Sequence, residues 1–274
     1  MNRRTAIGVG AASLLGGSAL ARAGKEAPAK PTTFVLVHGA WHGGWCWRDV
    51  RTLLEAQGHR VFTPALTGLG ERSHLREPVP NLSVHIQDVV NTIAFEELDR
   101  LVLCGHSYGG MVITGVVDRL KEKISHVVYL DAALPSDGQT MFSQNPNSKP
   151  LDDPATQAAI KFLAPDGVWM NVASTELLGI PKTDVEATAW VARRLTPHPL
   201  PSWTEPLRLE RGGSDGLART YVLCTNPILP QSAFPLHAAR VKNDPTWHYA
   251  EITTGHDAMV TAPENVAAIL LAAV

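Results

Sequence analysis

The chain of 274 residues contains only three cysteines, Cys46, Cys104 and Cys224. Three is too few, and an odd number, for a disulfide framework. Cys104 and Cys224 end apolar runs that are typical of strands, so we expect them to be small buried residues. A reactive thiol would need an exposed, electropositive setting. The cysteines therefore do not predict thiol chemistry.

The sequence also lacks an excess of charge of either sign. It has 24 Lys and Arg against 26 Asp and Glu, a net charge of −2. Such a balance does not favour nucleic acid or an anionic membrane as a partner. Among the eleven histidines no pair has the spacing of a metal site. The composition is that of an ordinary globular protein, long enough to bury a large core in one domain.

A long apolar run is missing as well. The Gly- and Ala-rich stretch 6–21 is too short and too often broken by glycine to span a membrane, which takes roughly 20 residues. It follows Arg3-Arg4 and precedes Ala21-Arg22-Ala23, a small-x-small cleavage pattern. Residues 1–23 are therefore predicted to be a cleavable export signal of the twin-arginine type, with 24–31 as a linker. The alternative is an uncleaved N-terminal anchor.

Export would place the mature protein in the periplasm or outside the cell. Removal of the signal would leave 21 of the 24 basic residues against 26 acidic ones. We expect no stable membrane association after processing, and the sequence does not indicate an oligomeric state.

Beyond the linker, short β-rich runs alternate with helical patterns. Strands separated by helices imply right-handed crossovers and a parallel sheet. The sequence thus predicts an α/β fold over residues 32–274, with about six parallel strands and helices on both faces. The strand-like runs are residues 33–37, 60–63, 100–104, 126–130, 219–224 and 247–252, and the helical patterns between them include 45–57, 82–97, 111–121 and 263–273.

One interval breaks this alternation. Between the runs that end at residue 130 and begin at residue 219, the chain is rich in proline and aromatic residues and holds helical patterns such as 183–195. So long an interval without a sheet strand suggests an inserted segment over a site. Residues 136–212 are therefore predicted to form a helical cap.

A nucleophile is predicted where the third strand meets the next helix. Gly105-His106-Ser107-Tyr108-Gly109 has the pattern G-x-S-x-G in the strand–helix context that this motif requires. The sharp turn strains the serine backbone and points its hydroxyl away from the sheet. We therefore interpret Ser107 as a nucleophile; the alternative is a tight turn that merely needs small residues.

Two backbone amides are candidates for an oxyanion hole. Val37-His38-Gly39-Ala40 ends the first strand and is expected to loop beside Ser107. The N–H groups of Ala40 and Tyr108 could then converge on a carbonyl oxygen as its negative charge develops. His38 and His106 are interpreted as structural residues of these loops.

The general base is predicted from its place in the fold. His256 follows the last strand, in TTGHDAM, and precedes the C-terminal helix. In a parallel sheet that loop lies at the same edge as Ser107. We assign His256 as base and then acid; the alternative is a loop histidine without chemistry. No other histidine has a comparable position.

Four stretches resemble the α/β-hydrolase fold, and within it the group of plant methyl esterases and hydroxynitrile lyases: FVLVHGAWHGGWCW, GHSYGGMVITGV, YLDAALPSDGQ and GHDAMVTAP. The resemblance implies a Ser-His-Asp triad, a small-molecule ester substrate and no cofactor. The lyases of this group have a threonine after the first-strand histidine and a lysine after the catalytic histidine. This chain has Gly39 and Asp257 there, which favours the esterase branch.

The triad acid departs from the family pattern. The resemblance places it in the loop after the next-to-last strand, where this chain has Asn226-Pro227 and no carboxylate before Asp244. Asp131 ends the fourth strand, 24 residues after Ser107, as the acid does in haloalkane dehalogenases. We therefore predict Asp131 as the acid. Asp244, Asp257 or no functional acid are the alternatives, as is a merely turn-capping Asp131.

Aromatic residues of the cap region suggest a hydrophobic chamber over Ser107. We expect it to accept carboxylic esters with small to medium hydrophobic or aromatic groups. The alternatives are a lactonase, a hydroxynitrile-lyase-like enzyme, or a non-catalytic binding protein on this scaffold. The predicted substrate-binding residues are Trp41, Phe142, Trp169, Trp190 and Trp203, although cap aromatics such as Phe162 often only fill the cap's own core.

Overall fold

The computed structural model describes residues 31–145 and 147–274. The predicted export signal, residues 1–23, and nearly all of the predicted linker, 24–31, lie outside the described residues. Within the described part, no helix is long and apolar enough to cross a membrane.

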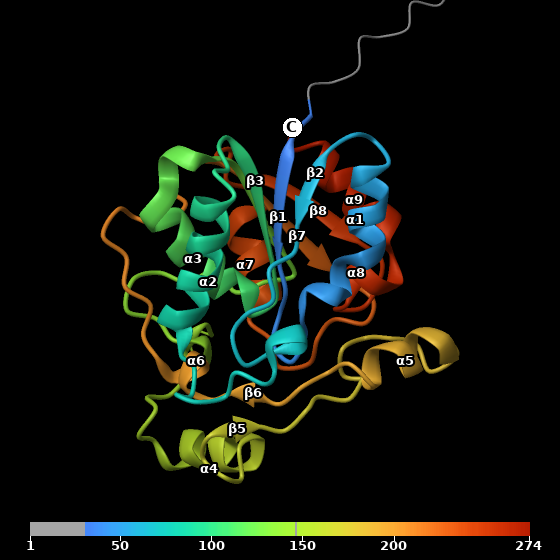
Figure 1. Cartoon of the computed structure of the whole chain (residues 1–274). Helices are drawn as coiled ribbons and strands as arrows, with labels where there is room; N and C mark the ends of the chain where they lie inside the picture. Colours follow the sequence, from blue (N-terminus) through green and yellow to red (C-terminus); the bar gives the residue numbers. More distant parts are fainter. Residues whose placement is uncertain (1–30, 146) are drawn as a thin grey trace, which may run out of the picture. The chain divides into compact units, whose positions relative to one another are not determined.

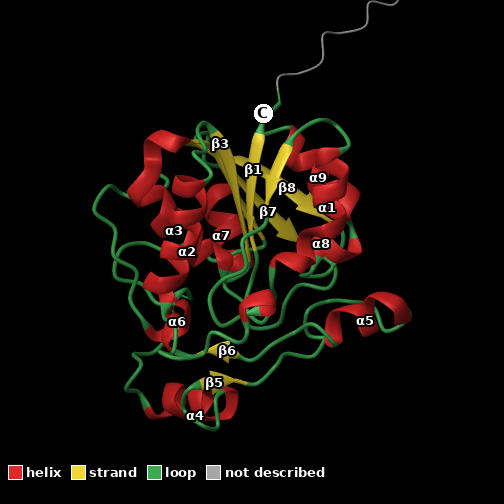
Figure 2. Ribbon diagram, in the orientation of Figure 1, coloured by secondary structure: helices red, strands yellow, loops and turns green. Residues whose placement is uncertain are grey.

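A six-stranded sheet forms the centre of the described domain (Figures 1 and 2). All of its neighbouring strands pair in parallel, in the order β2-β1-β3-β4-β7-β8. This confirms the predicted six parallel strands. The strands are β1 (Thr33–Val37), β2 (Arg60–Phe62), β3 (Leu101–His106), β4 (Ile124–Leu130), β7 (Ala218–Cys224) and β8 (His248–Ile252).

Helices cover both faces of the sheet because alternate residues of each strand point to opposite sides. In β1, for example, Val35 and Val37 belong to one buried cluster and Phe34 and Leu36 to the other. The first cluster is covered by α2 (Leu82–Phe95), α3 (Gly109–Leu120) and α7 (Phe234–Val241), and the second by α1 (Arg48–Glu55), α8 (Ala258–Thr261) and α9 (Pro263–Leu271).

Helix ends differ from the predicted ranges by a few residues. The pattern 45–57 divides into a 3-10 turn at Gly44–Trp47 and α1, which ends before Gly58, a glycine with φ of 84°. Cys104 and Cys224 are buried and unpaired, as predicted, and Cys46 is buried and unpaired as well. Cys104 and Cys224 lie in the cluster beneath α1 and α9.

The chain between β4 and β7 lies beyond the carboxyl ends of the strands (lower part of Figure 1). Residues 136–212, the predicted cap, span all of its regular elements. These are the 3-10 helix η4 (Met141–Ser143), α4 (Pro154–Leu163), β5 (Trp169–Met170), α5 (Val185–Ala192), β6 (His198–Pro199) and α6 (Pro201–Thr204), with β5 and β6 paired antiparallel.

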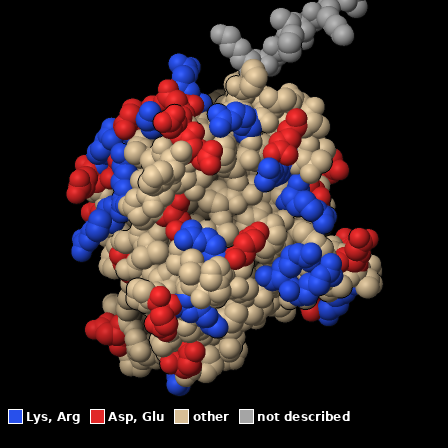
Figure 3. Space-filling view, in the orientation of Figure 1, with Lys and Arg blue, Asp and Glu red and all other residues tan. Residues whose placement is uncertain are grey.

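Acidic and basic side chains are mixed over the face drawn in Figure 3. Two basic side chains have an evident packing role, since the guanidinium groups of Arg48 and Arg194 both lie over the ring of Trp190 in α5, at 4.4 and 4.8 Å from its centroid. This mixture agrees with the near-neutral charge of the sequence.

Candidate active site

Ser107 lies in the sharp turn between β3 and α3. Its φ of 56° is in the left-handed region, which a non-glycine residue rarely adopts. The turn is possible because glycines flank it: a Cβ at Gly105 would lie 2.7 Å from the carbonyl oxygen of Gly109, and one at Gly109 would lie 2.8 Å from that of Val37. The close packing of this turn thus holds Ser107 in its strained conformation at the carboxyl edge of the sheet.

The loop after β1 packs directly against this turn. A Cβ at Gly39 would lie 2.8 Å from the Cβ of Ser107, so no side chain fits there without a shift of the backbone. The next residue, Ala40, is buried, as is Tyr108. Neither backbone N–H donates a hydrogen bond to any residue in 31–145 or 147–274. Both amides are therefore available to an oxyanion.

His256 and Asp131 are in contact although 125 residues separate them. Nδ1 of His256 lies 2.6 Å from Oδ2 of Asp131, and both side chains are 2% exposed. Oδ1 of Asp131 accepts a hydrogen bond from the backbone N–H of Cys224, at 3.1 Å. A carboxylate that accepts from Nδ1 fixes the tautomer of the imidazole and leaves Nε2 free to take a proton.

Two aromatic rings enclose the imidazole of His256. Phe234 stacks on it with 5.5 Å between ring centroids, and His106 lies 4.4 Å away on a tilted plane. Burial lowers the pKa of His106 well below its usual value, and the neutral ring donates from Nε2 to the carbonyl oxygen of His256 at 3.0 Å. His106 therefore packs beside the site and is not placed to act as its base.

The Ser107 hydroxyl makes no hydrogen bond to another described residue, including His256. Catalytic hydrogen bonds are often long in a site without substrate and shorten when it binds. Ser107 and His256 nonetheless line the same cavity.

The alternative acids do not reach His256. Asn226 is exposed, and its backbone N–H donates to Thr254, at 2.9 Å. Asp244 accepts from Thr246 at the surface. Asp257, next to His256 in sequence, points instead to His42. Of the three acid candidates, Asp131, Asp244 and Asp257, only Asp131 contacts the imidazole among the described residues.

A cavity of about 390 Å³ opens over Ser107 and His256. Its walls are mainly apolar and include three of the predicted residues, Trp41, Phe142 and Trp203. Trp169 and Trp190 do not line it, so their assignment as substrate-binding residues is corrected. The guanidinium of Arg76 lies 4.0 Å from the ring centroid of Trp169, and Trp190, in α5, packs against Trp45.

Sequence reasoning missed part of this wall. Residues 229–234, in the segment that follows β7, and Leu177 and Leu178 of the cap also line the cavity. Their residue types give no signal, because apolar loop residues without periodicity look the same whether they face a chamber or the core.

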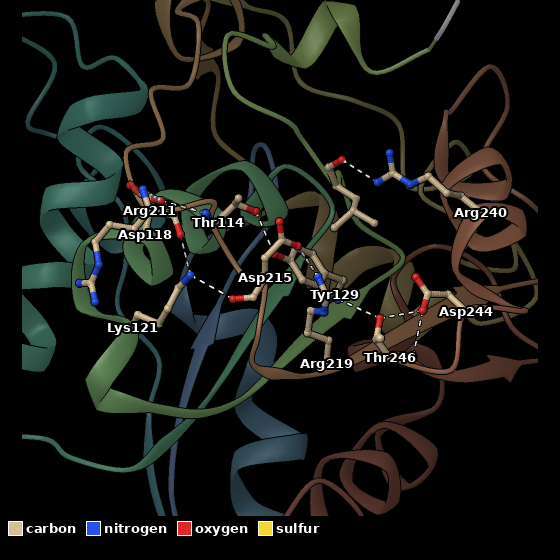
Figure 4. A network of polar contacts seen from close by, with 12 residues as sticks. Thr114, Asp118, Lys121, Tyr129, Arg211, Asp215, Arg219, Arg240, Asp244 and Thr246 are labelled. Atoms are coloured by element: carbon tan, nitrogen blue, oxygen red, sulfur yellow. Dashed lines mark hydrogen bonds and ion pairs between the residues drawn. The ribbon is translucent and has the colours of Figure 1, made fainter.

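A second cavity, of about 380 Å³, lies away from the first and has different chemistry. Polar contacts link the surrounding elements (Figure 4). Arg219 donates to Asp215 at 2.7 Å and to Thr246 at 3.0 Å, and Lys121 donates to the carbonyl oxygens of Arg211 and Asp215. Its described lining has no histidine or cysteine. It therefore holds no base comparable to His256 and does not resemble a second hydrolytic site.

Three groups that could bind a metal ion lie close together at the active site. Ligand atoms of His106, His256 and Asp257 lie within 4.8 Å of one another. One atom of each group is already in a contact: His106 with the backbone of His256, His256 with Asp131, and Asp257 with His42. The contact between His256 and Asp131 is the arrangement that acid–base chemistry needs.

Comparison with known proteins agrees with this geometry. The model of the alpha/beta hydrolase family matches residues 34–269, which is most of the chain. The chain belongs to the alpha/beta hydrolase family. A nucleophile at a strand–helix turn and a histidine after the last strand are the positions that this fold uses for catalysis.

Several relatives are named as esterases. A carbendazim hydrolyzing esterase from a Nocardioides species is 41% identical over 247 residues, 87% of this chain and 98% of the relative. Methylesterase 1 from Arabidopsis thaliana is 36% identical over 104 residues, 37% of this chain and 40% of the plant protein. These relatives place the chain among the carboxylic ester hydrolases.

Solved structures show the same fold. An extracellular alpha/beta-hydrolase from a Paenibacillus species superposes with a TM-score of 0.72 and 24% identity, over 89% of this chain and 99% of that one. At this level of identity the likeness extends to the fold alone.

Proposed function

We propose that the chain hydrolyses carboxylic esters through an acyl-enzyme on Ser107, with His256 as the general base and Asp131 as the acid of the triad. The contact of 2.6 Å between His256 and Asp131, beside Ser107 and under an apolar cavity, carries this proposal. It supplies the base and the orienting carboxylate that an unassisted hydroxyl needs.

The first half of the reaction forms the acyl-enzyme. Oγ of Ser107 attacks the carbonyl carbon while its proton passes to Nε2 of His256. The carbonyl oxygen becomes an oxyanion and accepts hydrogen bonds from the N–H groups of Ala40 and Tyr108. Asp131 stabilises the imidazolium that forms. The imidazolium then protonates the leaving alkoxide, and an alcohol departs.

The second half releases the acid. Water gives a proton to His256 and attacks the acyl carbon, the oxyanion forms again, and Ser107 leaves with the returned proton. No step needs a cofactor, because every proton moves between the substrate, water and the triad.

We further propose that the substrates carry a flat apolar group next to the scissile carbonyl. A cavity near 390 Å³ is at the small end of the usual range for ligand sites. The rings of Trp41, Phe142 and Trp203 contribute to its wall. The Nocardioides relative acts on carbendazim by its name, so aryl carbamate methyl esters belong to the first substrates to test.

The geometry at Gly39 argues against the lyase alternative. A threonine at this position would place its Cβ 2.8 Å from that of Ser107 and 2.9 Å from Nδ1 of His106. Asp257 supplies a negative charge where the lyase pattern has lysine. The lactonase alternative shares the acyl-enzyme chemistry and therefore belongs in the substrate panel.

Covalent labelling tests the proposal and separates it from a binding protein. After incubation with an aryl phosphonate ester, peptide mass spectrometry should find one adduct, on Ser107, and the labelled protein should no longer hydrolyse p-nitrophenyl esters. Ser107→Ala is the matched control and should stay unlabelled. A folded wild-type protein that takes no label would contradict the proposal.

A further inference from the structure

His42 connects two loops of the active site that are far apart in sequence. Its Nδ1 lies 2.8 Å from the carbonyl oxygen of Ala40, and its Nε2 lies 3.1 Å from Oδ2 of Asp257. The side chains of His42 and Asp257 are 1% and 0% exposed. Ala40 belongs to the oxyanion hole and Asp257 follows His256, so the pair joins the two loops directly.

The contacts of His42 require a charged ring. A carbonyl oxygen and an ionised carboxylate only accept hydrogen bonds, so both ring nitrogens must carry a proton to satisfy them. Burial opposes the charge, but the charge and hydrogen bond of Asp257, together with the hydrogen bond to the backbone of Ala40, outweigh burial and raise the pKa of His42 above its usual value. The ring of Trp45 stacks on the imidazole with 5.3 Å between centroids and shields it from water. The pair is thus a buried ion pair.

The turn that His42 holds is strained. Trp41, directly after Ala40, has a φ of 65°. Such a conformation costs about 1–3 kcal/mol and persists only where its surroundings impose it. From the cap side, the N–H of Thr196 donates to the carbonyl oxygen of Trp41 at 2.9 Å, and the N–H of Trp41 donates to His198 at 3.3 Å. His42, which contacts both Ala40 and Asp257, supplies a further restraint.

We propose that His42 and Asp257 form a positioning pair that fixes the oxyanion turn, Ala40–Trp41, to the loop of His256. The inference rests on the proposed function. Neither side chain touches the reacting atoms, and the pair acts through Ala40 and His256. It keeps the Ala40 N–H aligned with the oxyanion while His256 changes its protonation state.

This role predicts a specific kinetic effect. An amide that stabilises only the oxyanion contributes to kcat and not to substrate binding. Complete loss of one oxyanion-hole donor costs about 10²–10³ in kcat. A variant that loosens the turn but keeps the Ala40 N–H should lose less activity. We expect kcat to fall about 10- to 100-fold and KM to change by less than about 2-fold.

Three variants separate the parts of the pair. His42→Asn keeps a donor close to the position of Nδ1 and removes the contact with Asp257. His42→Gln keeps a donor close to the position of Nε2 and removes the contact with Ala40. Asp257→Asn keeps the shape and removes the charge. Asp118→Asn is the control, because Asp118 is also buried and accepts three backbone N–H groups, of Glu210, Arg211 and Gly213, away from the active site.

The probe is an aryl trifluoromethyl ketone, which adds to Ser107 and places an oxyanion in the hole. We expect each variant of the pair to bind it about 10- to 100-fold more weakly and to lose kcat on a p-nitrophenyl ester by a similar factor. Asp118→Asn should lower the thermal midpoint but keep the ketone affinity and kcat of the wild type.

Two results would overturn the inference. One is wild-type affinity for the ketone in folded His42→Asn and His42→Gln. These two variants are sufficient to overturn the inference even if Asp257→Asn does not fold. The other is a loss in the pair variants that Asp118→Asn reproduces at equal stability, which would show a role in folding alone. A wild-type protein that neither turns over esters nor binds the ketone would instead contradict the proposed function, and the inference with it.

Discussion

Strained residues gather around the candidate site. Six non-glycine residues of the described chain have positive φ, and four of them are Trp41, Ser107, Asp131 and Gln231. Three of these four line the cavity, and the fourth, Asp131, holds His256. Strain of this kind survives where the surrounding structure imposes it, which is common at functional sites. The strained backbone fixes the direction in which the Ser107 hydroxyl, the Asp131 carboxylate and the Trp41 ring leave the main chain.

Position in the fold made some of these residues predictable from the sequence. Ser107 and His256 occupy loops whose place relative to the sheet follows from strand order alone. Asp131 could be predicted as the acid for two reasons. The loop with Asn226 has no carboxylate, and the carboxyl ends of parallel strands, including the strand that Asp131 follows, lie at one edge of the sheet. The contact between His42 and Asp257 was not predictable, since 215 residues separate them and neither of the two stretches that contain them indicates a partner for its side chain. The side chain of Asp257 points to His42 although Asp257 is next to His256 in sequence.

At the residue scale we predict that Gly39→Ala damages the site directly. The new Cβ would lie 2.8 Å from that of Ser107 and 3.2 Å from the carbonyl oxygen of His106, neither of which is a flexible chain end. Overpacking of this kind costs about 1–3 kcal/mol. We expect kcat/KM to fall at least about 10-fold, because Ser107 and the neighbouring Ala40 N–H both shift. Unchanged turnover of a p-nitrophenyl ester would show that the loop relaxes freely.

At the scale of elements, the cap and the core meet at the loop of His256. The backbone N–H of Asp257 donates to the carbonyl oxygen of Leu178 at 3.0 Å, and the Cα of Gly179 would lie 2.6 Å from a Cβ at Gly255. Leu178 also lines the cavity. The cap segment therefore supports the catalytic loop as well as forming the wall of the chamber.

Gly255→Ala tests this contact between elements. The added methyl group should push the cap segment away from His256 and lower both the stability and kcat. A circular-dichroism melt and ester kinetics measure the two effects. Gly167→Ala serves as the control, because Gly167 lies in the cap with open space around its Cβ position and only its φ of 73° resists substitution. If both variants behave alike, the contact has no special role.

Elements were easier to predict than their contacts. The six strands follow from short β-rich runs, and their parallel pairing follows from the intervening helices. The cap's own arrangement did not follow, because Trp169 and Trp190 pack against Arg76, Arg48 and Arg194 in contacts that no periodicity reveals. Aromatic content alone cannot tell a ring that faces a chamber from one that packs under a guanidinium group.

The whole molecule should be sensitive to mild acid because it buries several neutral histidines. Burial lowers the pKa of His38 to about 3, and those of His85 and His237 to about 4. It also lowers the pKa of His106 and His198 well below the usual value. Below about pH 6.5 these histidines bind protons in the unfolded chain but stay neutral in the folded protein. The free energy of unfolding therefore falls as the pH falls.

Each such histidine removes up to about 1.4 kcal/mol of unfolding free energy per pH unit in that range. The raised pKa of His42 acts in the opposite direction, but it is one group against six, because burial also lowers the pKa of His126. We expect the thermal midpoint to drop by roughly 10 °C or more between pH 7 and pH 5.5. His237→Leu should reduce the slope. A midpoint that stays constant over this range would contradict the account.

Export remains a prediction for the whole chain. It depends on Arg3-Arg4 and Ala21-Arg22-Ala23. If the signal is cleaved, N-terminal sequencing of the protein secreted by its native host, or recovered from the periplasm, should begin near Gly24. Intact Met1 on membrane-bound protein would favour an anchor instead.

The central claim is that Asp131 supplies the acid of a Ser107–His256 triad, and Asp131→Asn tests it most directly. The asparagine keeps the size of the side chain but removes the charge that fixes the tautomer of His256, so kcat should fall by about 10³ to 10⁴ on a p-nitrophenyl ester. The circular-dichroism spectrum should be unchanged. Asn226→Ala, the control in the loop where the family places its acid, should keep nearly full activity because Asn226 is exposed and has no contact with the imidazole among the described residues. Near wild-type turnover in folded Asp131→Asn, or a comparable loss in Asn226→Ala, would contradict the assignment.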